Sequence, residues 1–315
     1  MIYSRRFLAL LSGITLLLAQ PMLAQTPGTW SLAGNMSTAR IMPTLAMLPD
    51  GTVLAAGGST SANTDIYDPT TSTWSLAGPM TTARKFQAGT VLADGRVLVA
   101  GGKDAAGNAL ASAEIYDPSA QTWTATGSMS TPRYYFSASL LLNGQVLVTG
   151  GYTAGTTITT NALTSSELWD PVTGQWTVTG NMANPHANQT ATVLTNGTVL
   201  VAGGEAFGDG LLGRGPTGAA EFYNPSTGAW ASLEAMSTAR QYAAAGVTSS
   251  RGQVLVAGGN SGGCCTGLAT AELFEPAAEQ CLTGCTPQPP TWWYVQDMPT
   301  HRAGPSVAEI GRAHV

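Results

Sequence analysis

The stretch that decides the fold is residues 74–123, WSLAGPMTTARKFQAGTVLADGRVLVAGGKDAAGNALASAEIYDPSAQTW. It opens with the pattern Trp-x-x-x-Gly-x-Met-x-x-x-Arg and continues with an alternating apolar run, a turn dipeptide and Val-Leu-x-x-Gly-Gly. A variable loop then leads to Glu-x-Tyr-Asp-Pro, and the next tryptophan closes the unit. Because this unit recurs along the chain, the repeat has to be interpreted before any local structure.

The repeat has a period close to fifty residues. Successive tryptophan spacings are 44, 49, 53 and 54 residues. Repeats of about 40–50 residues with many strand signals are typical of β-propeller blades. The tryptophans are Trp30, Trp74, Trp123, Trp176 and Trp230, with Trp292 or Trp293 next, and the Gly-Gly pairs are 57–58, 101–102, 150–151, 203–204 and 258–259.

Each unit predicts four short strands. In the first unit, Ile41–Leu48 alternates, Val53-Leu54-Ala55 precedes the Gly-Gly pair, a third strand ends at Tyr67-Asp68-Pro69, and the fourth carries the tryptophan. Asp-Gly and Asn-Gly dipeptides between the first two strands predict type I′ turns with two positive φ angles. These turns are Asp50-Gly51, Asp94-Gly95, Asn143-Gly144 and Asn196-Gly197, with Arg251-Gly252 in the fifth unit. No segment has helical periodicity, so we expect an all-β protein.

Composition limits the class of partner. The 315 residues are 43% hydrophobic and 10% charged, which argues against a disordered chain. The formal net charge is −5, from 13 Lys and Arg against 18 Asp and Glu. Nucleic-acid binding relies on a basic surface, so we expect no nucleic-acid partner.

The N-terminus predicts export. Arg5 and Arg6 precede an apolar run from Phe7 to Leu18, which is short for a membrane span and typical of a secretory signal peptide cleaved after Ala24. We therefore expect residues 1–24 to be removed. The mature chain would be periplasmic or extracellular, with no transmembrane segment.

The repeated residues resemble the kelch repeat, in the Gly-Gly pair, the Tyr-Asp-Pro that follows and the closing tryptophan. The resemblance extends from Trp30 to about Ala308 and implies a kelch-type β-propeller, with the Gly-Gly strand second in each blade and the tryptophan strand outermost. Galactose-oxidase-like enzymes share this propeller.

The order of the repeat elements predicts five complete four-stranded blades and a partial sixth. The first unit begins at an outermost strand, Trp30–Ala33, which would close the last blade. Residues 302–308 resemble an innermost strand, so we expect residues 25–308 to form a propeller that is incomplete at its C-terminus. The sequence thus has the features of a fragment, and Glu309–Val315 resembles a non-native tail.

One basic residue begins each innermost strand. Recurring once per blade, these residues predict a ring at one mouth of the channel, where guanidinium groups could bind an anionic ligand. The series is Arg40, Arg84, Arg133, His186, Arg240 and Arg302. The competing interpretation is architectural, because an acidic series can pair with it inside each blade. That series is Asp65, Glu114, Glu167, Glu221 and Glu272.

The loops after the Gly-Gly pairs vary in length and share a face with the arginine series in a propeller. Length variation on one face is how a repeat scaffold carries recognition. Residues 205–220 contain Phe207, Asp209 and Arg214, which are candidate ligand-binding residues. An ordinary surface loop is the alternative.

All four cysteines lie in the fifth unit. In an exported protein they favour disulfides over a zinc site. The intervening strand of about 23 Å separates Cys264 and Cys265 from Cys281 and Cys285, which favours a Cys281–Cys285 disulfide. Cys264 and Cys265 would then form a vicinal disulfide or remain thiols.

The chain offers no catalytic, metal or cofactor set that we can identify. His186, His301 and His314 do not match the ligands of the copper-radical oxidases. We therefore expect a recognition module for a protein or carbohydrate ligand on the channel face. A periplasmic carbohydrate-active enzyme of the mutarotase or oxidase type is the alternative, and a structural blade array within a larger surface protein is a third hypothesis.

Overall fold

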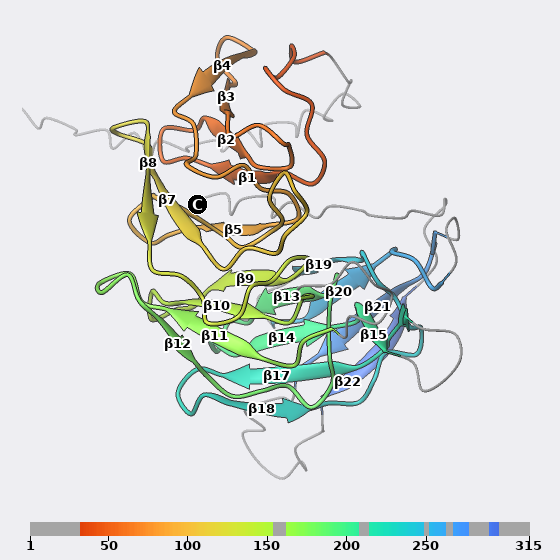
Figure 1. Cartoon of the computed structure of the whole chain (residues 1–315). Coiled ribbons are helices and arrows are strands. Elements are labelled where there is room, and N and C mark those ends of the chain that lie inside the picture. Colours follow the sequence, from red (N-terminus) through yellow and green to blue (C-terminus); the bar gives the residue numbers. More distant parts are fainter. Residues whose placement is uncertain are drawn as a thin grey trace, which may run out of the picture. The chain divides into compact units, whose positions relative to one another are not determined.

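The computed structural model describes residues 32–153, 162–207, 214–248, 252–262, 267–276 and 290–295. Within these ranges the chain forms 22 strands and no helix (Figure 1). Five antiparallel sheets of four strands account for all but two of the strands, and β15 and β16 form a separate hairpin. The prediction of an all-β kelch-type propeller is thus confirmed.

The four strands of each blade follow one another in sequence, from the innermost to the outermost position. The first three sheets contain β1 (Thr44–Met47), β2 (Val53–Ala56), β3 (Thr64–Asp68) and β4 (Thr73–Ala77); β5 (Ala88–Val91), β6 (Val97–Ala100), β7 (Ala113–Asp117) and β8 (Thr122–Thr126); and β9 (Ser137–Leu140), β10 (Val146–Thr149), β11 (Ser166–Trp169) and β12 (Trp176–Val178). The last two contain β13 (Thr190–Val193), β14 (Val199–Ala202), β17 (Ala220–Asn224) and β18 (Ala229–Ser232); and β19 (Ala244–Val247), β20 (Val254–Ala257), β21 (Ala271–Glu275) and β22 (Thr291–Val295).

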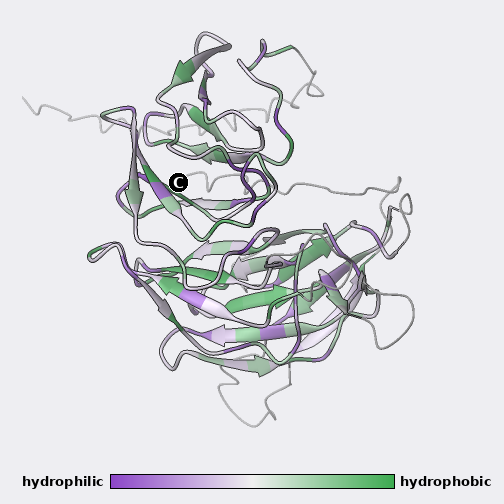
Figure 2. Ribbon diagram, viewed as in Figure 1, coloured by the Kyte–Doolittle hydropathy of each residue, from purple (hydrophilic) through white to green (hydrophobic). Residues whose placement is uncertain are grey.

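The innermost strands connect the blades into one series. Strand β1 lies beside β5, β5 beside β9, β9 beside β13 and β13 beside β19. Strand β14, the Gly-Gly strand of the fourth blade, has the sequence Val-Leu-Val-Ala, is buried throughout and is coloured as hydrophobic in Figure 2. This run of apolar residues is expected for a strand that is covered on both faces.

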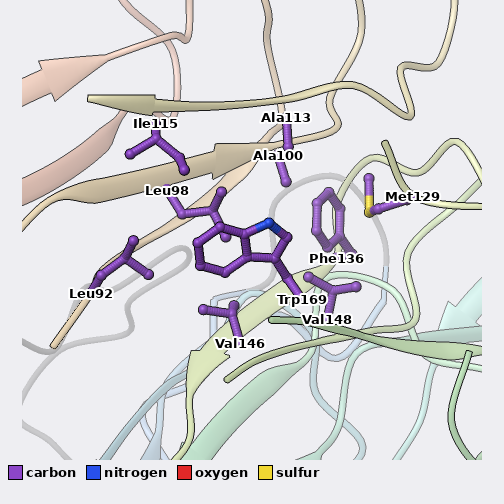
Figure 3. Close-up of a cluster of buried hydrophobic side chains, with 10 residues drawn as sticks. All are labelled: Leu92, Leu98, Ala100, Ala113, Ile115, Met129, Phe136, Val146, Val148 and Trp169. Carbon is purple, nitrogen blue, oxygen red and sulfur yellow. The ribbon is translucent and has the colours of Figure 1, made fainter. Parts of the chain in front are cut away.

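The hydrophobic cores lie between blades. Trp169 of the third blade packs with Leu98 and Ile115 of the second blade and with Val146 and Val148 of its own (Figure 3). Similar clusters join the other neighbouring blades, so each blade buries apolar surface against a neighbour.

The closing tryptophans also hydrogen-bond across blade boundaries. The indole Nε1 of Trp176 donates to the Gly127 carbonyl at 2.8 Å, and that of Trp230 donates to Gly180 at 3.0 Å. In the fifth blade Trp292 is the equivalent residue, because its indole donates to Glu234 at 2.9 Å, whereas Trp293 is exposed.

The turns between the first two strands differ from the prediction. Gly51 has φ +85°, but the preceding Asp50 is not among the residues with positive φ, so the turn is not type I′. The Gly51 amide donates to Leu48 and the Leu48 amide to Thr52, which closes a three-residue loop. This is a type I turn followed by a left-handed glycine, a common hairpin connection. The Asp50 carboxylate instead accepts the Thr52 amide at 3.0 Å.

Closure of the ring remains a prediction. Residues 302–308, which would form the innermost strand of a sixth blade, lie outside the described residues, as do residues 1–24 and 309–315. Of the predicted N-terminal strand only Leu32 and Ala33 are described, and neither is in a strand.

Candidate functional site

The arginine that begins each innermost strand is buried inside its own blade. The Arg84 side chain is inaccessible to solvent, and its Nη1 donates to the Gly101 and Ser112 carbonyls at 2.8 and 3.0 Å. Its Nη2 donates to the Glu114 carboxylate at 2.7 Å. That carboxylate also accepts the amides of Thr81 and Thr82. Arg84 therefore joins the Gly-Gly strand, the third strand and the loop that enters the blade.

The same arrangement recurs in the other arginine blades. Each guanidinium binds the first glycine carbonyl of its Gly-Gly pair and the acidic residue of the third strand. The ion pairs are Arg40–Asp65 at 2.5 Å, Arg133–Glu167 at 2.9 Å and Arg240–Glu272 at 3.0 Å, with side chains at most 1% exposed.

This geometry favours the architectural interpretation of the series. Burial lowers the pKa of Arg84 and of Arg133, and the carboxylates of Glu114 and Glu167 act against that shift. A ring of ligand-binding groups at the channel mouth requires accessible donors, and the guanidinium groups of Arg40, Arg84, Arg133 and Arg240 are buried. Arg302 lies outside the described residues.

His186 occupies the arginine position in the fourth blade. Its Nδ1 lies 2.7 Å from the Gly203 carbonyl oxygen, and its Nε2 lies 3.4 Å from Glu221 Oε1. The residue is fully buried, so the break in the arginine series is a local variation of the blade scaffold.

A hollow lies where the starting ends of the five innermost strands converge. It has a volume of about 400 Å³, and all five blades contribute to its lining. The lining residues stand two and three positions after the basic residue of each blade. They are Met42, Pro43, Phe86, Gln87, Tyr135, Phe136, Asn188, Gln189, Tyr242 and Ala243. We call this feature the central hollow.

One residue per blade lines the central hollow in a left-handed backbone conformation. The φ angles are 53° for Met42, 59° for Phe86, 56° for Tyr135, 55° for Asn188 and 53° for Tyr242. Positive φ is unusual for residues that carry a bulky side chain. Backbone strain of this kind clusters at functional sites. Five such residues at one repeat position make the central hollow the leading candidate site.

Backbone hydrogen bonds between blades hold this conformation. The Tyr135 amide donates to the Phe86 carbonyl at 3.0 Å, the Asn188 amide to Tyr135 at 3.0 Å and the Tyr242 amide to Asn188 at 3.1 Å. We call these three bonds the interblade belt. Four of the five strained residues, from Phe86 to Tyr242, are thus linked from blade to blade by their backbones.

Aromatic rings form the apolar part of the hollow. The Phe86 and Tyr135 rings have centroids 4.4 Å apart, and Tyr135 meets Tyr242 edge to face at 6.5 Å. Burial is the largest cause that raises the pKa of Tyr135 to about 12, with smaller effects from Tyr242, Tyr134 and Glu205. The Tyr135 phenol is therefore neutral across the physiological range.

Amide side chains form the polar part of the hollow. The Gln87 side-chain amide donates to the Ala56 carbonyl at 3.1 Å, and that of Gln189 donates to the Thr149 carbonyl at 2.8 Å. These bonds use the nitrogen of each amide, and the oxygens are buried without a hydrogen-bond partner in the protein. The side-chain oxygen of Asn188 is also buried and unpartnered. These oxygens are therefore enclosed by the protein and not exposed to the hollow, and that of Gln87 lies close to the Cβ position of Gly57 in the first blade.

The loops after the Gly-Gly pairs begin beside the hollow. Lys103 is bridged to Lys85, which precedes Phe86, and Glu205 is bridged to Ala187, which precedes Asn188. These contacts confirm that the loops and the arginine series share a face.

The fourth loop contains a hairpin of β15 (Glu205–Phe207) and β16 (Arg214–Pro216), in which Phe207 is opposite Arg214. Asp209 and all four cysteines, including Cys281 and Cys285, lie outside the described residues.

The described ranges contain no cluster of metal ligands and no membrane-spanning helix. No group of three or more His, Cys, Asp or Glu residues there could hold a metal ion. No helix in that part of the chain is long and apolar enough to cross a membrane.

Sequence reasoning found the face that carries the hollow but missed its lining. The lining includes the position two residues after the recurring basic residue, which holds Met42, Phe86, Tyr135, Asn188 and Tyr242. These residue types share no chemistry, so the repeat pattern does not mark them.

Comparisons with known proteins agree with this architecture. A family model described as "Kelch motif" matches residues 84–130 and 133–183, which contain the second and third blades. Among 380 matching chains of solved structures, "Structure of YjhT" has a TM-score of 0.66 and 17% identity, and the match covers 86% of this chain and 88% of that chain. At this identity the likeness shows the fold alone. No curated protein sequence matches the chain. The motif matches, the repeated four-stranded blades and the structural neighbour together support a kelch-repeat β-propeller.

Proposed function

We propose that this protein is an exported recognition module that binds a protein or glycan ligand in the central hollow. A kelch propeller supports a general interaction module. The observation that carries the proposal is the convergence of five strained residues, one from each blade, on a hollow lined by aromatic rings and amide side chains. Concave sites with aromatic walls and a few fixed polar groups are typical of ligand binding.

Binding is tested with a mixed glycan array and a displayed peptide library, using the mature chain and three variants. Tyr135→Ala removes the central aromatic ring, and Asn188→Gly removes one unpartnered acceptor while glycine keeps the left-handed backbone. Gln175→Ala, on an exposed turn, is the matched control.

We expect ligands that bind the mature chain and the Gln175→Ala variant and bind at least tenfold more weakly to Tyr135→Ala. Ligands that bind all the variants equally would place recognition elsewhere and would overturn the proposal.

Export is the second part of the proposal and rests on the basic and apolar pattern of residues 1–24. Expression of the full sequence in a bacterial host should give a protein outside the cytoplasm whose intact mass begins at Gln25. A protein that keeps Met1 and stays in the cytoplasm would contradict export and would leave the binding proposal unaffected.

The enzymatic alternative needs an acid–base pair near the channel. The described residues that line the central hollow contain no carboxylate and no imidazole, so no observation there favours this function.

A further inference from the structure

We propose that Lys85 and Lys103 bind a negatively charged group at the rim of the central hollow, so that the ligand is an anion with an apolar body. We call these two residues the lysine pair. This inference rests on the proposed function and adds the charge of the ligand. It follows from the placement of the two lysines, their lack of acidic partners and their contact with the aromatic rings of the hollow.

The lysine pair places two like charges directly opposite each other. Lys85 and Lys103 are the only lysines of the chain. The Lys85 amide donates to the Lys103 carbonyl at 2.9 Å, and the Lys103 amide donates to the Lys85 carbonyl at 2.7 Å. Residues paired in this way have side chains on the same face, with Cβ atoms about 5 Å apart, and like charges there are destabilising. An anion beside both ammonium groups would offset that repulsion.

No carboxylate forms an ion pair with the lysine pair among the described residues. Asp104 follows Lys103 directly, but its carboxylate accepts the main-chain amide of Asn108 at 2.8 Å and the side-chain amide at 3.0 Å. Both lysines are partly exposed to solvent. An anion from solution therefore has access to two cations that the protein itself leaves without a counter-charge.

The other cationic side chains that the structure describes are already paired. Arg96 forms an ion pair with Asp94 at 2.7 Å. The rest are buried within blades beside a carboxylate, and they are Arg40, Arg84, Arg133, His186 and Arg240. Among these described side chains, only the lysine pair combines access to solvent with the lack of an acidic partner. The anionic ligand that the sequence suggested for the arginine series therefore fits the lysine pair instead.

Aromatic rings connect the lysine pair to the central hollow. The Lys103 Nζ lies 4.1 Å from the centroid of the buried Tyr134 ring, a cation–π contact that holds the ammonium group at this edge. The Tyr134 ring is 5.5 Å from that of Tyr135, which lines the hollow. Lys85 directly precedes Phe86, a second lining residue. A charged group on the lysine pair is therefore adjacent to an apolar group against Phe86 and Tyr135.

The test uses three small probes that separate charge from the aromatic ring. Benzoate has a carboxylate and a ring, benzamide has nearly the same shape without the charge, and acetate has the charge without the ring. Their dissociation constants for the mature chain are measured by NMR titration at low ionic strength. We expect benzoate to bind roughly tenfold or more tightly than either of the other probes. This advantage over benzamide should shrink in about 0.5 M NaCl, because salt screens accessible charges.

Charge-removing variants locate the anion. Lys85→Gln and Lys103→Gln should each weaken benzoate binding by roughly tenfold, the equivalent of one charge-assisted hydrogen bond, and leave benzamide binding unchanged. Arg96→Gln is the matched control, because it also removes one positive charge but lies in a surface ion pair with Asp94 at the other end of β5. It should bind benzoate as the mature chain does. Tyr135→Ala should weaken the binding of both benzoate and benzamide.

Three results would overturn the inference of an anionic ligand: benzoate does not bind, benzamide or acetate binds as tightly as benzoate, or both lysine variants keep the benzoate affinity of the mature chain. If library ligands respond to Tyr135→Ala but not to Lys103→Gln, the recognition function stands and the anion inference fails. If benzoate responds to the lysine variants but not to Tyr135→Ala, the lysine pair binds an anion and recognition in the hollow fails.

Discussion

At the scale of single residues, four blades are each organised by one buried guanidinium and one carboxylate, and the fourth blade has His186 in place of the arginine. The four blades with arginine have a polar residue two positions before the carboxylate. These residues are Asn63, Ser112, Ser165 and Thr270. In three of them the hydroxyl accepts from the arginine Nη2, as Ser165 does at 3.2 Å. The blade with His186 has Ala219 at this position. The fourth blade therefore departs from the arginine blades at both the basic position and the position two before its carboxylate.

This covariation predicts a stabilising double change. We expect His186→Arg with Ala219→Ser to raise the free energy of unfolding by about 1–2 kcal/mol, because a charge-assisted bond to Glu221 replaces the 3.4 Å imidazole contact. The measurement is urea unfolding at pH 7, followed by tryptophan fluorescence.

The single variant His186→Arg is the control, because one of its buried donors would lack the serine hydroxyl. It should be less stable than the double variant. A double variant that unfolds at a lower urea concentration than the natural chain would show that blade four is packed around the smaller imidazole.

At the scale of elements, the Gly-Gly pair is where one blade meets the next. Gly150 has φ +65°, and a Cβ there would lie 2.2 Å from the His186 carbonyl oxygen. Gly151 donates its amide to the same carbonyl at 2.7 Å. The pair is therefore required by close approach of two backbones, and no phosphate is needed to explain it.

A matched pair of alanine substitutions separates crowding from backbone strain. Gly150→Ala and Gly144→Ala both place a side chain at positive φ, but Gly144 has nothing within 4 Å of its Cβ position. The free energy of unfolding of both variants should fall by about 1–2 kcal/mol because of backbone strain. That of Gly150→Ala should fall by about 1–3 kcal/mol more because of overpacking.

Thermal and urea unfolding of the two variants check this prediction. Equal losses would mean that the blade interface yields to the extra methyl group. In that case the two backbones at the blade interface could move apart at little cost in free energy, despite their short distance.

At the scale of the whole molecule, stability depends on buried carboxylates that recur from blade to blade. Burial by itself raises the pKa of Glu221, but hydrogen bonds from His186 and from the amides of Ala183 and Asn184 outweigh it and leave the pKa lowered. Burial also raises the pKa of Asp65, but Ser37 and Arg40 outweigh it in the same way, so its pKa is lowered too. The folded state thus favours the ionised form of both groups.

The direction of these shifts predicts acid unfolding. A carboxyl whose pKa is lower in the folded than in the unfolded chain stabilises the fold above its unfolded pKa of about 4, and that stability is lost as the pH falls further. We expect the free energy of unfolding to be nearly constant from about pH 7 to pH 5 and to fall steeply between about pH 4 and pH 3.

Glu221→Gln tests the contribution of one blade. It should be less stable than the natural chain at pH 7, because a buried acceptor is replaced by a donor. The further decrease in its free energy of unfolding on acidification should be smaller than in the natural chain, since the variant lacks one titrating carboxyl group. Identical pH profiles for the two proteins would contradict a lowered pKa at Glu221.

Local pattern was sufficient to predict the blades. Strand positions and their order follow from alternation and from the Gly-Gly and Trp spacing, because each blade is built from consecutive residues. The sequence also offered the pairing of Arg84 with Glu114, since both recur at the same interval. Tertiary structure decided the rest. Whether a guanidinium faces the channel or the blade interior depends on packing, and packing buries it.

The central hollow could not be predicted from the sequence, because its lining comes from residues such as Phe86, Tyr135 and Asn188, about fifty positions apart and unlike in chemistry. They meet only when five innermost strands lie side by side, and their left-handed backbones are held by bonds from one blade to the next. Repetition along the chain therefore determined the scaffold. Convergence in space, which no local pattern records, determined the site.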